Sequence, residues 1–275
     1  MVTSETPVRI LGAMSIRLEH IMPFGVKFSL ADIAKTLEVF HHWIEHPDVA
    51  HQVCIANVHT TMTAVNDPDF LAVNNSADLV TMDGMPLVWV ARLLGYQDAQ
   101  RVAGPDLLEA VCRVSVARGY RHFFYGGCQR ALDGLVAKLK QDYPGIDIVG
   151  AIAPPFRPLT LEEEQSVVIA INKARPHFLW VGLGAPKQER WICSHRNLLG
   201  VPIQIGVGAA FDFLSGTVKR APPWMQRSGL EWLFRLSQDP RRLWKRYVVS
   251  NFQFLLLAAR LLVTRRLVGR RTRDC

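Results

Sequence analysis

The stretch Phe178-Leu-Trp-Val-Gly182-Leu-Gly184 decides the fold class of this 275-residue chain. Its run of apolar residues is typical of a strand buried on both faces, and the glycines that follow indicate a tight turn. Similar runs, separated by helical patterns, lie at residues 53–57, 79–82, 122–125, 146–149 and 203–207. Strands that alternate with helices indicate βαβ units, so we predict an α/β fold with a mainly parallel sheet and flanking helices.

Three polar signals predict where helices begin. Asp67-Pro68 is typical of an N-cap followed by proline in the first helical turn. Thr160-Leu-Glu-Glu163 is a full capping box. Ser29-Leu-Ala-Asp32 has the same spacing, with Asp in place of the usual Glu or Gln, and predicts a helix that Ser29 caps.

The C-terminal part of the chain differs from the rest in charge. Residues 220–275 hold 13 Lys or Arg and three acidic residues, whereas residues 1–219 hold 19 and 21. Strand patterns stop near residue 221, and helical patterns rich in Trp, Arg and Leu follow. We therefore predict a body over residues 1–220 and a basic helical appendage over residues 221–275. Such an appendage suggests an anionic partner, either nucleic acid or anionic lipid.

Apolar residues within the appendage favour a membrane over nucleic acid. Tyr247–Ala259 carries no charge but is shorter than the roughly 20 residues that a transmembrane helix needs. We therefore expect this run to lie in the interface of an anionic membrane, held there by the neighbouring basic residues. The alternative is that part of it packs on the body or on a second subunit of a homo-oligomer.

The cysteines and the N-terminus indicate a cytoplasmic protein. The five cysteines include no C-x-x-C pair, and an odd number fits reduced thiols better than a disulfide framework. Residues 1–11 lack the apolar core of a signal peptide. Together with the basic appendage, this predicts peripheral attachment to the cytoplasmic face of the plasma membrane.

Ligands of an open parallel sheet bind beyond the carboxyl ends of its strands. Asp83 follows an apolar strand there and could remove a proton from a hydroxyl, although an Asp that caps the next helix has the same pattern. The glycine-rich strand ends could hold a diphosphate with their N–H groups or simply make tight turns. The glycines in question are Gly126, Gly127, Gly184 and Gly208.

Two motifs suggest other chemistry but are weaker. Asp67-Pro-Asp69 matches a metal-binding pattern of nucleotide-sugar enzymes, but a helix start explains it, so we expect no metal site. Gly206-Val-Gly208 begins a dinucleotide fingerprint whose third glycine and ribose-binding acid are missing. A nicotinamide-dependent oxidoreductase is therefore only an alternative, as is a nucleic-acid-binding protein, and we expect no bound cofactor.

Several longer motifs follow one another in a characteristic order. They are Met82-Asp-Gly84, Arg101-Val-Ala-Gly-Pro-Asp106, Val181-Gly-Leu-Gly-Ala-Pro-Lys-Gln-Glu189, Gly206-Val-Gly-Ala-Ala-Phe-Asp212, Arg220-Ala-Pro-Pro-Trp-Met225 and Gly229-Leu-Glu-Trp-Leu-Phe-Arg235. Together they resemble the WecG/TagA/CpsF glycosyltransferases, glycosyltransferase family 26, over about residues 50–250. The resemblance implies a Rossmann-like body with a C-terminal helical appendage.

The resemblance also implies an activity. Members of this family move a sugar from a UDP-sugar to a polyprenyl-diphosphate-linked sugar, with inversion and without a metal. The reaction belongs to surface polysaccharide synthesis at the cytoplasmic membrane face. The donor sugars that the family allows are N-acetylmannosamine, its uronic acid and glucose, and the chain itself does not choose among them.

Residue roles follow from the same resemblance. Asp83 matches the catalytic base, Asn57 and Gln188 match polar residues of the sugar pocket, and Asp212 matches an acid that contacts the nucleotide. Arg101 matches a basic residue that could hold the diphosphate or the acceptor. The expected phosphate partners in the appendage are Arg235, Arg241 and Arg242.

One position departs from the family pattern. Many relatives have Thr two residues before the pocket asparagine, whereas this chain has Ile55. We expect any hydroxyl contact at that position to be lost unless Thr60 or Thr61 supplies it.

Overall fold

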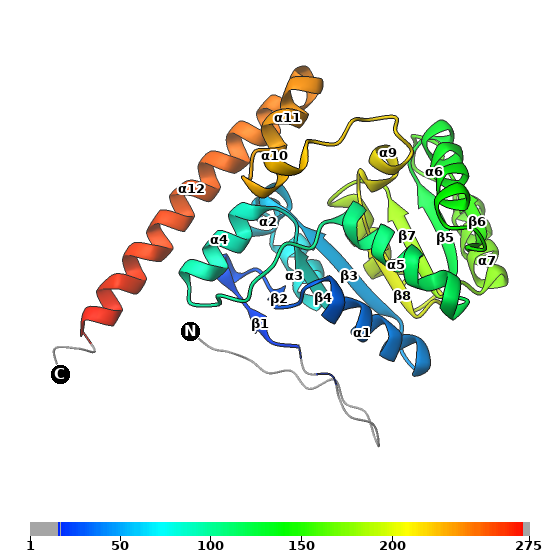
Figure 1. Ribbon diagram of the computed structural model, residues 1–275, viewed down its shortest axis with the longest axis horizontal. Coiled ribbons are helices and arrows are strands. Elements are labelled where there is room, and N and C mark those ends of the chain that lie inside the picture. The colour runs from blue at the N-terminus through cyan, green and yellow to red at the C-terminus, as the bar shows by residue number, and fades with distance from the viewer. Residues whose placement is uncertain (1–15, 17, 272–275) are drawn as a thin grey trace.

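A computed structural model describes residues 16 and 18–271, with side chains up to Thr264. The expectation for residues 1–11 and the charge of Arg273 lie outside this part of the chain. The centre is a six-stranded sheet in which every strand pair is parallel (Figure 1), which confirms the predicted α/β class. Its strands, in spatial order, are β4 (Leu79–Met82), β3 (His51–Ala56), β8 (Ile203–Gly206), β7 (Phe178–Gly182), β5 (Arg121–Gly126) and β6 (Asp147–Ile152).

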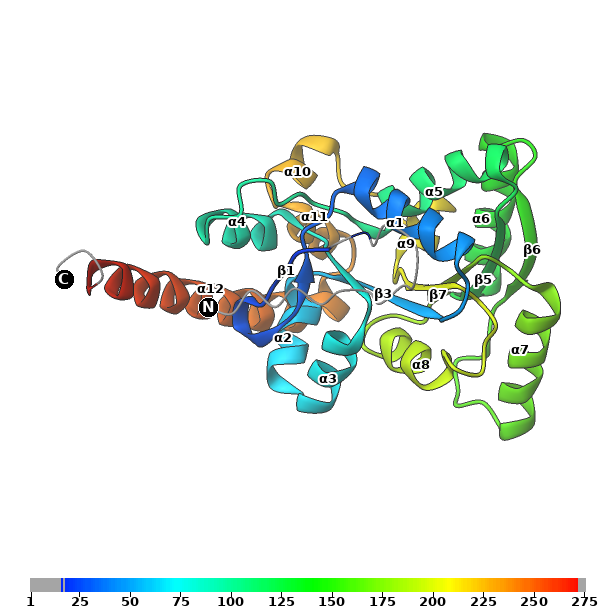
Figure 2. The same cartoon turned by 90° about the horizontal axis from the view of Figure 1, so that it is seen from below.

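Helices cover both faces of the sheet (Figure 2) because successive residues of each strand point to opposite sides. In β3, Val53 and Ile55 belong to one core cluster, while Cys54 and Ala56 belong to another. On the first face lie α1 (Ile33–Glu45), α5 (Gly104–Arg118), α6 (Gln129–Asp142) and α9 (Ala210–Leu214). On the second lie α2 (Val58–Asn66), α3 (Pro68–Ser76), α7 (Leu161–Ala174) and α8 (Lys187–His195), and α4 (Met85–Leu93) packs near β4.

Two of the three predicted helix starts are confirmed. The side chains of Asp67 and Thr160 cap α3 and α7 as expected. The third prediction is wrong, because Asp32 rather than Ser29 caps α1. Ser29 ends the short strand β2 (Phe28–Ser29), which pairs with β1 (His20–Ile21) across a 3-10 turn (Pro23–Gly25). Its hydroxyl accepts a hydrogen bond from the backbone of Val80 at 3.1 Å, so it joins this hairpin to β4.

Three helices follow the sheet, and the boundary predicted at residue 220 falls in the loop before them. They are α10 (Pro223–Arg227), α11 (Glu231–Gln238) and α12 (Pro240–Arg271). α12 runs along α2 and projects beyond the body, at the opposite end of the molecule from β6 and α7 (Figures 1 and 2). Its contacts with the body bury Leu243, Tyr247 and Phe254, and Gln253 exchanges two hydrogen bonds with Asn66 of α2.

The exposed side of α12 is long and apolar. Over Pro240–Thr264 the helix is long and apolar enough to cross a membrane, judged by length and composition alone. The expectation of a run too short to span holds only for its uncharged part, because Arg260 is the single charge between Tyr247 and Thr264. Only 17% of the apolar window is buried within the protein. Most of this apolar window is therefore exposed.

Candidate active site

Asp83 lies in the short connection between β4 and α4. Its N–H donates to the carbonyl of Ala56 at 2.8 Å, which ties the end of β4 to the end of β3. Gly84, with φ +119°, is the N-cap of α4, and no side chain caps this helix. The alternative interpretation of Asp83 as a helix cap is therefore wrong. Its carboxylate, with a side chain 27% exposed, faces a cavity instead.

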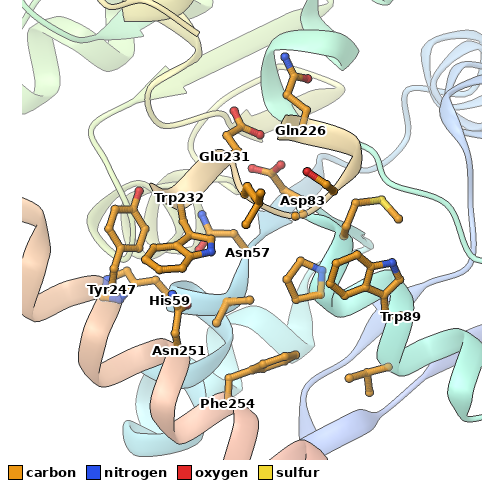
Figure 3. Close-up of a pocket in the computed structure, with 18 of the residues that line it drawn as sticks. Asn57, His59, Asp83, Trp89, Gln226, Glu231, Trp232, Tyr247, Asn251 and Phe254 are labelled. Atoms are coloured by element: carbon orange, nitrogen blue, oxygen red, sulfur yellow. The ribbon is translucent and has the colours of Figure 1, made fainter. Parts of the chain in front are cut away.

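The cavity has a volume of about 450 Å³ and lies between the strand ends of the body and helices α4, α11 and α12. Figure 3 shows that Asp83, Glu231 and Gln226 gather at one end of it, while Trp89 and Phe254 lie toward the other. The apolar wall comes from α4 and α12 and consists of Trp89, Val90, Leu93, Phe254, Leu255, Ala258 and Leu262. A carboxylate therefore stands at the head of an apolar groove.

Arg101 joins the body to the appendage beside Asp83. Its Nη2 donates to Asp106 at 2.7 Å and to Gln226 at 3.0 Å. Its Nη1 lies 3.7 Å from Asp83 and 3.6 Å from Glu231. The Arg101 guanidinium is thus surrounded by three carboxylates and one amide oxygen. The role predicted for Arg101, binding a diphosphate or the acceptor, would therefore have to compete with these contacts.

The surroundings of Asp83 favour its protonated form. Burial and the negative charge of Glu231 raise the pKa of Asp83 to about 7, against the opposing charges of Arg101 and Arg220. A carboxylate with a pKa near 7 is a stronger base than an ordinary Asp and is still half ionised at neutral pH. A pKa near the operating pH favours general-base catalysis.

Of the two predicted sugar-pocket residues, Asn57 lines the cavity and Gln188 is buried outside its lining. Asn57 lines the cavity and forms a capping box with Thr60 at the start of α2. Gln188 is 2% exposed, and its Oε1 accepts from the N–H groups of Gly184 and Gly208 at 3.1 and 3.0 Å. Gln188 therefore links the loops that contain Gly184 and Gly208. A direct contact of Gln188 with the sugar stays a prediction.

The glycine-rich strand ends make close contacts within the protein. A Cβ on Gly126 would lie 2.5 Å from the backbone of Gly182, and the N–H of Gly127 donates to the carbonyl of Gly182. The N–H groups of Gly184 and Gly208 are taken by Gln188. These three amides are thus used within the protein, and their predicted contact with a diphosphate stays a prediction.

Two of the three predicted arginines meet Asp212 in a second hollow of about 320 Å³. Arg235 and Arg242 line it together with Asp212, and Arg235 also lines the first cavity, so the two hollows adjoin. Burial raises the pKa of Asp212, while both arginines oppose this. Arg241 is exposed and lies outside the lining of both. The structure therefore separates Arg241 from the pair with which it was predicted.

A fourth arginine stands beside this pair. Arg246 is half-buried, and its Nε has no hydrogen-bond partner. Burial, with the positive charges of Arg235 and Arg242, lowers the pKa of Arg246. Like charges gathered around a hollow are favourable when an anion binds there.

Neither threonine near Ile55 replaces the missing hydroxyl. Ile55 is buried in the core. The hydroxyls of Thr60 and Thr61 both donate to the carbonyl of Asn57, at 2.9 and 2.8 Å, and neither residue lines the cavity. The departure from the family pattern therefore leaves an apolar position at this strand end.

Asp67-Pro-Asp69 acts as a helix start. Asp67 accepts from the backbone of Phe70 at 3.0 Å and pairs with Arg190 at 2.7 Å. Among residues 16 and 18–271, no group of three or more His, Cys, Asp or Glu side chains is placed to hold a metal ion. The four cysteines in the same part of the chain are free thiols.

Sequence reasoning missed several residues of the site, above all Glu231 and the groove wall. Glu231 belongs to the family motif at residues 229–235, but only the fold brings it close to Asp83. The groove wall of α12 has a helical signal, since Tyr247, Asn251, Phe254, Ala258 and Leu262 recur every three or four residues. A second apolar stripe on the same helix obscured that signal.

Comparison with known proteins identifies the family of this chain. The sequence profile of the glycosyl transferase WecG/TagA/CpsF family matches residues 21–268. The chain therefore belongs to this family, as the ordered motifs predicted. The assignment favours a glycosyltransferase over the alternative of a nicotinamide-dependent oxidoreductase.

Two relatives carry the same name, N-acetylglucosaminyldiphosphoundecaprenol N-acetyl-beta-D-mannosaminyltransferase. The one from Bacillus subtilis (strain 168) is 34% identical over 82% of this chain and 85% of its own length. The one from Staphylococcus aureus (strain MW2) is 26% identical over 76% of this chain and 80% of its own length.

Proposed function

We propose that this protein transfers N-acetylmannosamine from its UDP-sugar to a polyprenyl-diphosphate-linked N-acetylglucosamine during surface polysaccharide synthesis. The observation that carries the proposal is the position of Asp83, a carboxylate with a pKa near 7 at the head of an apolar groove. Family membership supports the transfer of a sugar. The names of the relatives support the choice of donor and acceptor among those that the motifs left open.

The proposed reaction is a single displacement. The acceptor hydroxyl oxygen bonds to the anomeric carbon, and the bond from that carbon to the UDP oxygen breaks. The bonding electron pair leaves with UDP, and the hydroxyl proton passes to the Asp83 carboxylate. Attack from the face opposite to UDP inverts the configuration, and one base is enough for this step.

The groove fits the acceptor. A polyprenyl diphosphate has an anionic head and a long hydrocarbon chain. The chain would lie against Trp89, Leu93 and Phe254, where burial of apolar surface is favourable by about 25 cal/mol per Å². The sugar at the other end would then meet Asp83 and Asn57.

The appendage arginines would stabilise the departing UDP. We expect Arg242→Ala to weaken UDP binding about 10- to 100-fold, because a hydrogen bond to a charged group is worth roughly 1.5–3 kcal/mol. Isothermal titration with UDP measures the effect. The neighbouring change Arg241→Ala is the matched control, since Arg241 lies outside the hollow, and it should change affinity less than threefold. Equal losses in both variants would contradict a specific role for Arg242.

We expect transfer to proceed without an added divalent metal. Arginines and the base supply the charges that the reaction needs, and Asp67-Pro-Asp69 is occupied as a helix start. The measurement is the initial rate in EDTA, for the unmodified protein and for Asp69→Asn, whose side chain is exposed. Both rates should equal the rate without chelator. If EDTA lowers the initial rate and added Mg²⁺ or Mn²⁺ restores it, the reaction needs a metal, which would contradict this prediction.

A donor screen tests the proposed function as a whole. Purified protein is mixed with a short-chain lipid-diphosphate N-acetylglucosamine and, separately, with the UDP forms of N-acetylmannosamine, its uronic acid and glucose. Mass spectrometry should find product with UDP-N-acetylmannosamine. Product with either of the others alone would change the donor, and no product with any would overturn the proposal.

A further inference from the structure

Glu231 and Asp83 come from different parts of the fold and share one cation. The Nη1 atom of Arg101 lies 3.7 Å from a carboxylate oxygen of Asp83 and 3.6 Å from one of Glu231. This nitrogen is buried and has no hydrogen-bond partner. Both distances exceed hydrogen-bond length, so the cation stands between two carboxylates and binds neither closely.

The charges around Asp83 do not balance. Asp106 accepts hydrogen bonds from both Arg101 and Arg220, and these are the closest contacts that the two guanidinium groups make. Arg220 also lies 3.8 Å from Glu231. Three carboxylates thus share two guanidinium groups, and neither Asp83 nor Glu231 receives a hydrogen bond from either of them.

We propose that Glu231 is a positioning residue that sets the basicity of Asp83, so that the base reaches full strength only when α11 is docked on the body. The inference rests on the proposed function, which makes Asp83 the base. Docking brings the Glu231 charge to Asp83 and removes water from it. Withdrawal of α11 would remove the Glu231 charge and admit water to Asp83, which would remain near Arg101, Arg220 and Asp106 and would be a weaker base.

Other groups near Asp83 do not explain the effect. Arg101 and Arg220 lower the pKa of Asp83, and Asp106, on α5, raises it less than Glu231 does because both arginines bind Asp106. His59 lines the same cavity, but burial lowers the pKa of His59 to about 4, so it does not titrate near neutral pH.

The test is a direct titration of Asp83 in the full-length protein. Aspartate carboxyl groups are labelled with ¹³C, and the Asp83 resonance is assigned by its loss in Asp83→Asn. The unmodified protein should show a midpoint near pH 7, and Glu231→Gln should show a midpoint lower by about one pH unit or more. Glu231→Asp, which keeps the charge, should lie between them. Glu162→Gln, at an exposed residue of α7, is the matched control and should leave the midpoint unchanged.

The pH dependence of kcat/KM provides the second measurement. Its acidic limb should shift to lower pH in Glu231→Gln by the same amount as the resonance. A uniform loss of rate with unchanged midpoints would mean that Glu231 only holds α11 in place, and would overturn the proposal. Because the resonance needs no substrate, its shift can be found even if the donor screen fails, so the two failures are distinguishable.

Discussion

Replacing Asp83 by Asn is expected to lower turnover by about 10²-fold or more, the usual contribution of a general base. The amide keeps the size of the side chain but cannot accept the hydroxyl proton. Asp83 stands at the end of β4, where its carboxylate faces the cavity and has a pKa of about 7. The measurement is kcat for transfer to the lipid-linked acceptor at pH 8, where the unmodified carboxylate is mostly ionised.

Two controls separate chemistry from folding. UDP affinity and the melting temperature should stay near those of the unmodified protein, because Asp83 lies outside the second hollow, which Arg235 and Arg242 line. Asp69→Asn, an exposed acid on α3, should keep full turnover. An Asp83→Asn variant with near-normal turnover would remove Asp83 from the role of base.

The second large effect concerns the membrane. Phe252 and Leu256 are 64% and 56% exposed and lie one turn apart on α12, with Val249 and Val263 on the same stripe. We expect Phe252→Glu with Leu256→Glu to weaken binding to anionic vesicles by about 10²-fold or more. Burying such a side chain in an apolar medium is worth about 1.5–3 kcal/mol, and each new charge also meets repulsion from anionic lipid.

Co-sedimentation with vesicles at low and high salt measures this loss. Leu161→Glu with Ile169→Glu is the matched control, because these residues of α7 are at least as exposed but lie at the opposite end of the molecule. The double change on α12 should also abolish transfer to a full-length lipid acceptor while UDP still binds. Equal sedimentation of both variants and the unmodified protein would show that this stripe is no membrane surface.

These substitutions are a better test than removal of the whole helix. Deletion from Pro240 onward would uncover the sites where Leu243, Tyr247 and Phe254 are buried. A truncated protein that failed would then report lost packing as well as lost membrane contact. The exposed stripe carries no such ambiguity, since its side chains touch little of the body.

The sheet could be predicted because its signals are local. The run Phe178–Val181 became β7 with one more residue, Gly182, and Asp67 caps α3 within its own first turn. The prediction that Ser29 caps a helix was wrong for the opposite reason. Its hydroxyl bonds to Val80, far away in the sequence, and no spacing rule near Ser29 reveals that contact.

The site could be predicted only where a strand end fixes it. Asp83 and Asn57 follow strands, so topology alone places them at the same edge of the sheet. Glu231 and Gln188 depend on tertiary contacts. Gln188 is directed inward by two loop amides, and Glu231 reaches Asp83 only when the appendage docks.

The long helix shows why composition was not enough. Its charges and apolar residues predicted a membrane surface, with packing on the body or on a second subunit as the alternative, whereas α12 both packs on the body and keeps an exposed apolar side. Phe254 faces the groove and the body, and Phe252 faces outward. Two residues apart on a helix point to different sides, so a run that is apolar on both sides has no clear period.

The most direct test of this account is the anomeric configuration of the product. Purified protein is supplied with UDP-N-acetylmannosamine, which is α-linked, and a lipid-diphosphate N-acetylglucosamine in EDTA. The new linkage is then read by nuclear magnetic resonance. Direct displacement with Asp83 as the single base predicts one N-acetylmannosamine in β-linkage. An α-linked product would contradict the single displacement, and transfer that proceeds only with added metal would contradict the arginines as partners of the departing UDP.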